Sequence, residues 1–255
     1  MKEKAMSNRT AFERDGFLIL RAFFPPAQIA AVVPEAERLL GLTSIIQERN
    51  LRCRWQTHHI TGALAFETFD PVVDISPICL DLALAPALLA LLGDLYGDRA
   101  CLFKDKLIFK PPGVHGYGLH QDWIAWPGFP KSFLTVLIPL DAADESNGCT
   151  IAYSGYHHRG SLSAEDGTYH ELPAELVDEK RAVPLLLQPG DIAVFGGFTP
   201  HRSAPNRSQS WRRQLYLSYN KASDGGQQRA RHYQEFHAWL QARHRKNNQF
   251  DFYFQ

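Results

Sequence analysis

The spacing of hydrophobic positions in the N-terminal part of the chain predicts helices. Within residues 25–41, apolar side chains recur at the intervals of one helix face, at Ile29, Val32, Val33, Ala36, Leu39 and Leu40. Gly41 follows directly, as is typical of a helix end. The apolar run of residues 80–97 predicts a second, more buried helix with Pro86 near its start. A last helix is predicted within residues 227–246, where one apolar stripe is formed by Tyr233, Phe236 and Leu240.

From residue 100 onwards the pattern changes to short β-rich runs. Turn sequences separate these runs, among them Pro111-Pro112-Gly113, Asn147-Gly148 and Pro189-Gly190-Asp191. Many short strands joined by Gly and Pro turns are typical of a sandwich or a jelly roll. No internal repeat, low-complexity tract or linker interrupts the sequence. We therefore expect one domain over residues 1–255, mostly helical in 1–99, with a β core in 100–220 and a C-terminal helix and tail in 221–255.

Composition and charge narrow the class of protein. Of the 255 residues, 45% are hydrophobic and 21% are charged, which is ordinary for a soluble enzyme. The formal net charge is zero, so nothing indicates a nucleic-acid or membrane partner. We find no run of about 18 apolar residues and no apolar segment in the polar N-terminus, so we expect neither a membrane span nor a signal peptide, and a cytoplasmic location. The four cysteines lie far apart in the sequence and are expected to be reduced and buried.

The candidate chemistry lies in the β-rich part. His120 and Asp122 are two positions apart, so both side chains can reach one ion if the segment is extended. His201, just after the run "DIAVFGGF", is the candidate third ligand from a distant strand end. Two histidines and one carboxylate leave three positions open on an octahedral iron, as non-haem Fe(II) oxygenases require. Structural zinc is less well served, because it prefers a closed tetrahedral shell rich in sulfur.

A candidate anchor for a carboxylate follows the third ligand. Arg212 lies eleven positions after His201 and opens the run "RRQLYLSYN". A buried guanidinium offers a planar fork of donors that matches the distal carboxylate of 2-oxoglutarate. Ser203 can add a hydroxyl to the same carboxylate. Because Arg213 is adjacent in an extended run, we expect Arg212 to point inward and Arg213 to point outward.

These motifs together resemble the phytanoyl-CoA dioxygenase family of Fe(II)/2-oxoglutarate oxygenases. The resemblance covers roughly residues 10–220 and is carried by "FERDGFLILRAFFPPAQI", "LHQD", "NGCTIAYSGYHHRGSL" and "PHRSAPNRSQSWRRQLYLSYN". It implies a mainly β fold with flanking helices, built on a double-stranded β-helix core (jelly-roll, cupin-like). It also implies Fe(II), 2-oxoglutarate and O₂ as cofactor and cosubstrates. The site residues carried over are the iron ligands His120, Asp122 and His201, and the 2-oxoglutarate contacts Arg212, Ser203 and Lys106.

The sequence departs from the family at two places. The usual "PGSH" is "SGYH" at residues 154–157, and Leu137 stands about where the acyl-CoA enzyme type carries a tryptophan. These departures concern the substrate rather than the iron chemistry. Iron halogenases of this superfamily replace the carboxylate ligand by a small residue, so the presence of Asp122 argues against halogenation.

We therefore expect a dioxygenase that hydroxylates an aliphatic C–H bond of a small metabolite or a natural-product intermediate, with release of succinate and CO₂. The same iron chemistry used for cyclisation, desaturation or epimerisation is an alternative. A cupin-like metal enzyme without 2-oxoglutarate and a non-catalytic binding module are alternatives of other classes. The sequence predicts a small-molecule substrate and gives no indication of oligomeric state.

Candidate contacts for the substrate lie next to the predicted metal ligands in the sequence. Trp123 and Trp126 directly follow the predicted metal ligands, and we expect them to wall the pocket, with a role as core rings as the alternative. Arg202 and Arg207 are expected near its mouth, where they could hold an anionic group. Residues 215–236 look like the tail of bacterial relatives that hydroxylate small polar molecules, including aminoalkylphosphonates. His58 and His59 fit a surface or lid segment, and the pair at 157–158 fits a turn.

Overall fold

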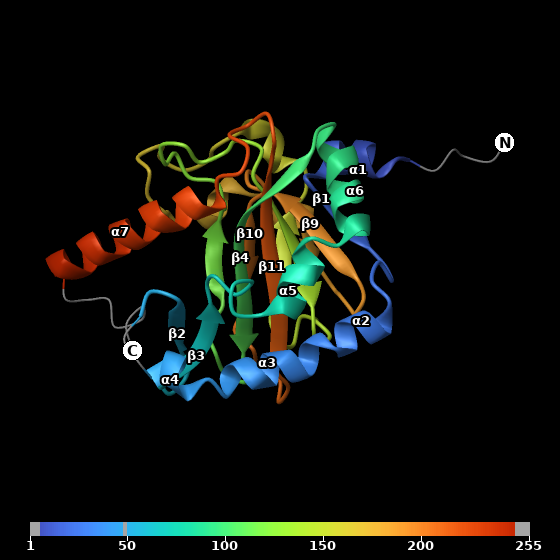
Figure 1. Cartoon of the computed structure of the whole chain (residues 1–255). Coiled ribbons are helices and arrows are strands. Elements are labelled where there is room, and N and C mark those ends of the chain that lie inside the picture. The colour runs from blue at the N-terminus through green and yellow to red at the C-terminus, as the bar shows by residue number, and fades with distance from the viewer. Residues whose placement is uncertain (1–5, 48–49, 248–255) are drawn as a thin grey trace.

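The large sheet of the protein forms the back of the candidate site. The computed structural model describes residues 6–47 and 50–247 (Figure 1). Its large sheet has the strand order β1-β9-β6-β11-β4-β3-β2, with every neighbouring pair antiparallel. The strands are β1 (Phe17–Leu20), β2 (Cys53–Thr57), β3 (Leu64–Phe69), β4 (Ala100–Lys110), β6 (Leu134–Pro139), β9 (Ile192–Gly196) and β11 (Arg212–Lys221).

A smaller sheet of four strands completes the jelly roll. Its order is β5-β10-β7-β8, and its strands are β5 (Tyr117–His120), β7 (Thr150–Tyr153), β8 (Ala182–Pro184) and β10 (His201–Ser203). An apolar cluster joins the two sheets, in which Leu137 and Phe195 of the large sheet pack with Ala152 of the small one. This is the double-stranded β-helix core that the resemblance implies.

Alternation along the strands separates an apolar outer face from a polar inner face. Leu215 and Leu217 of β11 belong to the large core cluster outside the barrel, and so do Leu107 and Phe109 of β4. The positions between them point the other way and carry polar groups into the barrel, notably Lys104, Lys106, Lys110, Arg212, Gln214, Tyr216 and Ser218. The alternation of side chains along β4 and β11 therefore places apolar residues in the outer core and polar residues inside the barrel.

Helices cover the outer face of the large sheet. They are α1 (Asn8–Asp15), α2 (Pro26–Ala30), α3 (Val32–Leu40), α4 (Thr43–Gln47), α5 (Pro77–Ala83) and α6 (Pro86–Tyr96). The helix expected over residues 25–41 is present as α2 and α3, and α3 ends at Gly41. The apolar run at 80–97 is also split, because Pro86 begins a new helix.

The segment Pro77–Tyr96 corrects the expectation that the chain contains no apolar run of about 18 residues. It is long and apolar enough to cross a membrane on those two criteria alone. In the structure it is broken into α5 and α6, and residues from Cys79 to Leu95 pack into the large core cluster. Its packing in this fold is that of core helices.

The N-terminal part also contains strands that the hydrophobic pattern did not reveal. The strands β1, β2 and β3 lie in residues expected to be mostly helical, and they extend the large sheet at both ends. Each is only four to six residues long, so the alternation in the sequence is too short to be distinctive.

The last helix, α7 (Arg229–Asn247), lies against β4 beside the open end of the barrel (Figure 1). Tyr233 and Leu240 of the expected apolar stripe are buried, and Phe236 is half-buried. Short 3₁₀ helices at Tyr156–Arg159, Ala174–Leu176 and Glu179–Arg181 lie in the connections around the small sheet.

Candidate metal centre and active site

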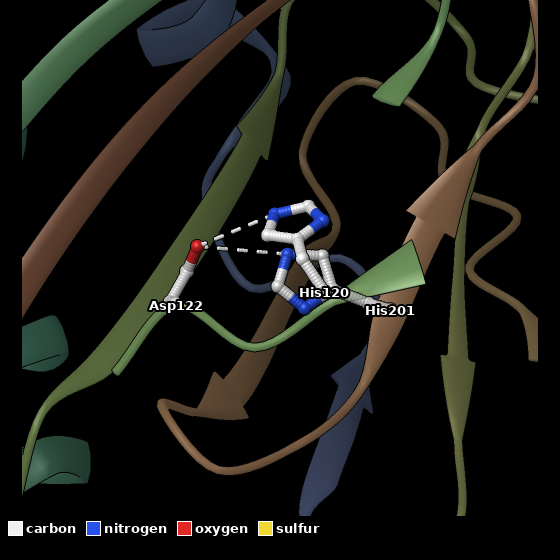
Figure 2. Close-up of side chains that lie close together, drawn as sticks. All are labelled: His120, Asp122 and His201. Atoms are coloured by element: carbon white, nitrogen blue, oxygen red, sulfur yellow. Dashed lines mark ion pairs between the residues drawn. The ribbon is translucent and has the colours of Figure 1, made fainter. Parts of the chain in front are cut away.

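Three side chains converge at the mouth of the barrel. His120 ends β5 and His201 begins β10, and these two residues are register partners in the small sheet. Their rings are 4.2 Å apart, and the Nε2 atom of each lies 3.7 Å from Oδ1 of Asp122 (Figure 2). One ligand atom from each of the three residues lies within 4.8 Å of the others, so they can hold one metal ion.

Hydrogen bonds behind these side chains orient them toward a common point. His120 Nδ1 lies 2.8 Å from the Gly118 carbonyl oxygen, and His201 Nδ1 lies 3.0 Å from that of Thr199. A protonated Nδ1 donates to these carbonyls, which leaves the Nε2 lone pairs for a metal. Asp122 Oδ2 accepts a hydrogen bond of 3.1 Å from Thr135 Oγ1 of β6, so Oδ1 remains toward the imidazoles.

The protonation states also fit a divalent cation. Burial and the neighbouring His120 lower the pKa of His201 to about 4. Burial by itself would raise the pKa of Asp122, but the His201 and His120 imidazoles outweigh it and hold that pKa well below its usual range. Neutral imidazole and ionised carboxylate are the forms that ligate metals, so near neutral pH no proton has to be removed from His201 or Asp122.

A cavity of about 430 Å³ opens beside the three side chains. Four other residues expected in the site from the sequence line it, namely Lys106, Trp126, Arg202 and Ser203. Lys106 Nζ lies 5.1 Å from the centre of the Tyr216 ring. Tyr169, from the connection between β7 and β8, places its ring 5.3 Å from His120 at the outer side of the cavity.

Two basic side chains lie side by side behind the deep end of this cavity. Arg212 is 1% exposed and is the register partner of Lys110, which is also 1% exposed. Lys110 Nζ donates to the carbonyl oxygens of Gly148 and Ala204 and lies 3.4 Å from Ser203 Oγ. Burial and the neighbouring Arg212 lower the pKa of Lys110 to about 6.

The donors of Arg212 are only partly satisfied. Its Nη1 donates to Gln214 Oε1, while its Nε and the Nε2 of Gln214 are buried and have no hydrogen-bond partner within the described residues. No described carboxylate lies within ion-pair distance of Arg212 or Lys110. A buried guanidinium with unused donors, beside the Lys110 amine and the Ser203 hydroxyl, fits the carboxylate of an acidic ligand.

The neighbouring arginine points the other way. Arg213 donates through Nε and Nη2 to the two carboxylate oxygens of Asp141, both at 2.8 Å. It also lies 3.7 Å from Glu37 of α3, on the helix-covered face of the sheet. Arg212 and Arg213 therefore occupy opposite faces, as the extended run indicates.

The structure corrects the interpretation of Trp123. This residue is 6% exposed and packs against Phe198 at a ring distance of 4.9 Å, and it is not among the residues that line the cavity. Its backbone N–H bonds to the carbonyl oxygen of Gly197, which turns the side chain toward the barrel wall. Trp126 does line the cavity, and its ring lies 5.6 Å from Trp239 of α7.

The remaining candidates from the sequence lie further from the metal ligands. Arg202 lines the cavity but is ion-paired with Glu179 at 2.9 Å. Arg207 is exposed and does not line the cavity. His59 lies in the connection between β2 and β3, and its Nδ1 contacts the carbonyl oxygen of Gly113. His157 Nε2 contacts the carbonyl oxygen of Glu13.

Sequence reasoning missed two cationic residues of the barrel interior. Lys104 lines the cavity, and Lys110 reaches Ser203 from its deep end. The signal was present in "KDKLIFK", because Lys104, Lys106 and Lys110 are separated by even numbers of residues and so share one face of a strand.

Comparison with known proteins agrees with this geometry. The family model of phytanoyl-CoA dioxygenase matches residues 12–214. A 2-aminoethylphosphonate dioxygenase of an uncultured bacterium is 36% identical over 137 residues, which cover 53% of this chain and 51% of the relative. A methylphosphonate hydroxylase of Gimesia maris is 39% identical over 134 residues, which cover 52% of this chain and 50% of the relative. The chain thus matches about half the length of these two relatives.

Solved structures share the fold. EctD from S. alaskensis, crystallised with 2-oxoglutarate and 5-hydroxyectoine, superposes with a TM-score of 0.71 at 21% identity over 89% of this chain and 82% of its own. The epimerase SnoN, in complex with Fe³⁺ and α-ketoglutarate, gives 0.69 at 22% identity over 83% of this chain and 81% of its own. With the family model matched over most of its length, the chain belongs to the phytanoyl-CoA dioxygenase family.

Proposed function

We propose that the protein is an Fe(II)- and 2-oxoglutarate-dependent dioxygenase that hydroxylates an aliphatic C–H bond of a small anionic metabolite, with organophosphonates as the first class to test. The observation that carries this proposal is the convergence of His120, Asp122 and His201 on one point at the mouth of the barrel. Two histidines and a carboxylate leave the open positions that a cosubstrate and O₂ require.

One group of residues would hold the iron, and a second group keeps these ligands oriented. His120, Asp122 and His201 would hold Fe(II), and Thr135 and the backbone carbonyls behind the histidines keep these ligands oriented. When bound there, iron supplies the oxidising chemistry of this enzyme class. The overall reaction is balanced as substrate C–H plus 2-oxoglutarate plus O₂ giving substrate C–OH plus succinate plus CO₂.

The deep end of the barrel would hold the cosubstrate. Arg212 offers the buried guanidinium for the distal carboxylate, and Ser203 and Lys110 lie beside it. Lys106 lines the cavity between this end and its mouth. A fixed anchor at this end places the keto-acid end of 2-oxoglutarate toward the three metal ligands.

The charge of the cavity supports an anionic substrate. Its lining includes the cations Arg54, Lys104, Lys106 and Arg202, against the acids Asp122 and Glu171. A volume of about 430 Å³ is in the range of small-ligand sites. Two relatives named for phosphonate substrates support the same class.

The proposal is tested by succinate release from 2-oxoglutarate in the presence of Fe(II) and ascorbate. Methylphosphonate, 2-aminoethylphosphonate, betaines, amino acids and acyl-CoAs are compared as stimulants. Stimulation by an organophosphonate is the expected result. Strong coupling to an acyl-CoA and none to the small polar compounds would contradict the proposed substrate class.

The outcome at the substrate carbon is read from the product. Hydroxylation adds one oxygen atom, desaturation or ring closure removes two hydrogen atoms, and epimerisation leaves the mass unchanged. The expected result is a gain of one oxygen, because an unrearranged hydroxylation needs no residue beyond those that hold the iron, the cosubstrate and the substrate.

A further inference from the structure

A polar path connects the metal ligands to Lys104. Thr135 Oγ1 donates to Asp122 and lies 3.1 Å from Ser218 Oγ of β11. Ser218 is in turn the register partner of Lys104 on β4. Lys104 therefore points into the cavity on the side of the metal site where helix α7 lies, and it lines the cavity together with Arg54 of β2.

We propose that Lys104 and Arg54 form the subsite that holds the anionic end of the substrate, and that α7 walls this subsite. The inference rests on the proposed function, since it names the residues that select the substrate for that reaction. The ligand class is an alkylphosphonate, whose tetrahedral anionic group can accept hydrogen bonds from an ammonium and a guanidinium together.

The two cations share one counterion. Lys104 Nζ lies 3.0 Å from Oδ2 of Asp70, and Arg54 donates to the same oxygen. The other oxygen of Asp70 accepts a hydrogen bond of 2.9 Å from the Tyr233 hydroxyl. Asp70 is fully buried. Lys104 and Arg54 also line the cavity, where an anionic ligand can reach both of them.

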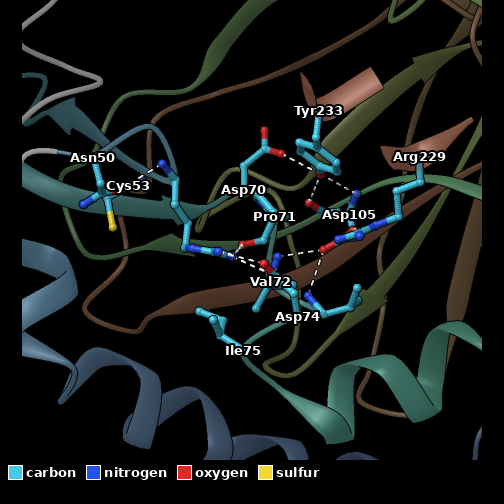
Figure 3. A network of polar contacts seen from close by, with 12 residues as sticks. Asn50, Cys53, Asp70, Pro71, Val72, Asp74, Ile75, Asp105, Arg229 and Tyr233 are labelled. Carbon is cyan, nitrogen blue, oxygen red and sulfur yellow. Dashed lines mark hydrogen bonds and ion pairs between the residues drawn. The ribbon is translucent and has the colours of Figure 1, made fainter. Parts of the chain in front are cut away.

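Two buried acids, Asp70 and Asp105, bind side chains of helix α7 (Figure 3). Tyr233 bonds to Asp70, and Arg229 Nε lies 2.7 Å from Asp105 Oδ2. Asp105 also accepts from the backbone N–H groups of Val72 and Val73. The charge of Asp105 is therefore matched by Arg229, and the helix is fixed where its inner face meets the two cations.

Aromatic rings of α7 complete the wall. The Phe236 ring centre lies 4.3 Å from Lys104 Nζ and 5.7 Å from the guanidinium carbon of Arg54. Trp239 pairs with Trp126, which follows the metal ligands in the sequence. Such faces hold the position of a cation and suit a short alkyl chain. A phosphonate held by Lys104 would thus place its carbon chain between these rings and the metal ligands.

The subsite is well separated from the cosubstrate end. Lys104 and Lys110 are six residues apart on one strand, which spans about 20 Å between their Cα atoms at about 3.3 Å per residue. The two anions would therefore bind at opposite ends of the cavity, with the metal ligands between them. A change at Lys104 should leave 2-oxoglutarate binding intact.

The test is an anaerobic calorimetric titration of the enzyme, loaded with Fe(II) and 2-oxoglutarate, with methylphosphonate. Lys104→Met is expected to weaken methylphosphonate binding by about 30-fold or more, as for one lost partner of a buried charge pair. Lys104→Arg, which keeps a positive charge, should retain most of the affinity for methylphosphonate. Lys180→Met, at an exposed lysine far along the chain, is the control. The affinity for 2-oxoglutarate should change less than about twofold in all three, since their positions do not touch the Arg212 end.

A readout on the unmodified protein guards against a variant that does not fold. Ethylphosphonate should compete with methylphosphonate on the wild type, whereas ethylamine should not. Unchanged methylphosphonate binding in Lys104→Met overturns the subsite, and so does a wild type that binds no alkylphosphonate. Binding that depends on Lys104 without any turnover leaves the subsite standing and refutes the proposed function. Coupled turnover of an organophosphonate that Lys104→Met leaves unaffected refutes the subsite and leaves the proposed function standing.

Discussion

The adjacent arginines of β11 offer a sharp test of how the cosubstrate is held. Arg212→Met removes a guanidinium that is 1% exposed and has no described carboxylate partner, and keeps a side chain of similar length. Arg213→Met makes the same chemical change one position later, on the opposite face of the sheet, where the guanidinium is already paired with Asp141. The two variants differ only in which face loses its charge.

The expected effect of Arg212→Met on the cosubstrate follows from its burial. Removing one partner of a buried, hydrogen-bonded charge pair typically costs about 2–5 kcal/mol. Since about 1.4 kcal/mol is a factor of ten in affinity, 2-oxoglutarate binding should weaken by about 30-fold to about 4,000-fold. Arg213→Met should change it by less than about twofold, because Arg213 does not reach the barrel interior.

The expected effect on stability runs the opposite way. Arg213 and Asp141 form a half-buried, two-pronged pair, so its loss should lower the free energy of unfolding by about 1 kcal/mol, the upper end of the range for exposed pairs. Arg212 contributes no such pair in the cosubstrate-free protein, and it lies next to Lys110, whose pKa it lowers. Its removal takes away a buried guanidinium that has unused donors and no described carboxylate partner, so it should cost less stability than the removal of Arg213.

The assay combines anaerobic 2-oxoglutarate titration of the Fe(II) enzyme with urea unfolding of the metal-free protein. The crossed result expected is a large affinity loss with little instability for Arg212→Met, and the converse for Arg213→Met. Equal effects of the two variants on affinity, or the reverse order, would refute the assignment of Arg212 to the cosubstrate.

Three further changes test other parts of the site. His201→Ala should abolish stoichiometric iron binding and turnover while leaving the circular dichroism spectrum intact; full iron content by metal analysis would exclude His201 as a ligand. Trp123→Ala should cost about 3–5 kcal/mol in urea unfolding, since it empties a core position, whereas Trp126→Ala should mainly reduce substrate-stimulated succinate release; the opposite pattern would restore Trp123 as the pocket wall. Burial and then Lys104 lower the pKa of His232 to about 3, so the unfolded chain binds an extra proton between about pH 6.5 and about pH 3 and stability falls as the pH falls through that window. His232→Phe should flatten the dependence of unfolding free energy on pH between about pH 7 and about pH 5, and an unchanged slope would contradict this.

The convergence of His120, Asp122 and His201 was predictable because their positions depend on local rules. His120 and Asp122 are two residues apart at a strand end, and the inward face of Arg212 follows from strand alternation. The jelly roll itself was indicated by short strands between Gly and Pro turns. These features require only the periodicity of the chain and the spacing of a few motifs.

The features that sequence reasoning missed depend on tertiary position. Trp123 leaves the pocket because its backbone bonds to Gly197, a contact with a residue far along the chain. The strands β2 and β3 are too short to be recognised until they pair at the edge of the large sheet. Lys104 gains its proposed role only because α7 returns from the C-terminal end to cover it.

Strand β4 runs along the cavity and places basic side chains from one end of it to the other. Lys110, Lys106 and Lys104 follow one another along its inner face, from the buried Arg212 to the aromatic wall of α7. The register of β4 with β11 shifts directly after Ser218, so Phe103 is an extra residue there and is buried among Phe129, Phe133 and His232 instead of continuing the alternation. Such a bulge re-aims the strand at the rim of a barrel. The inward-facing lysines therefore end beside the metal ligands, and an anion bound by Lys104 cannot move further toward solvent without leaving the charged face. In the proposed subsite, selection of the substrate and the position of its C–H bond would then depend on Lys104 at this end of β4, together with Arg54 of β2.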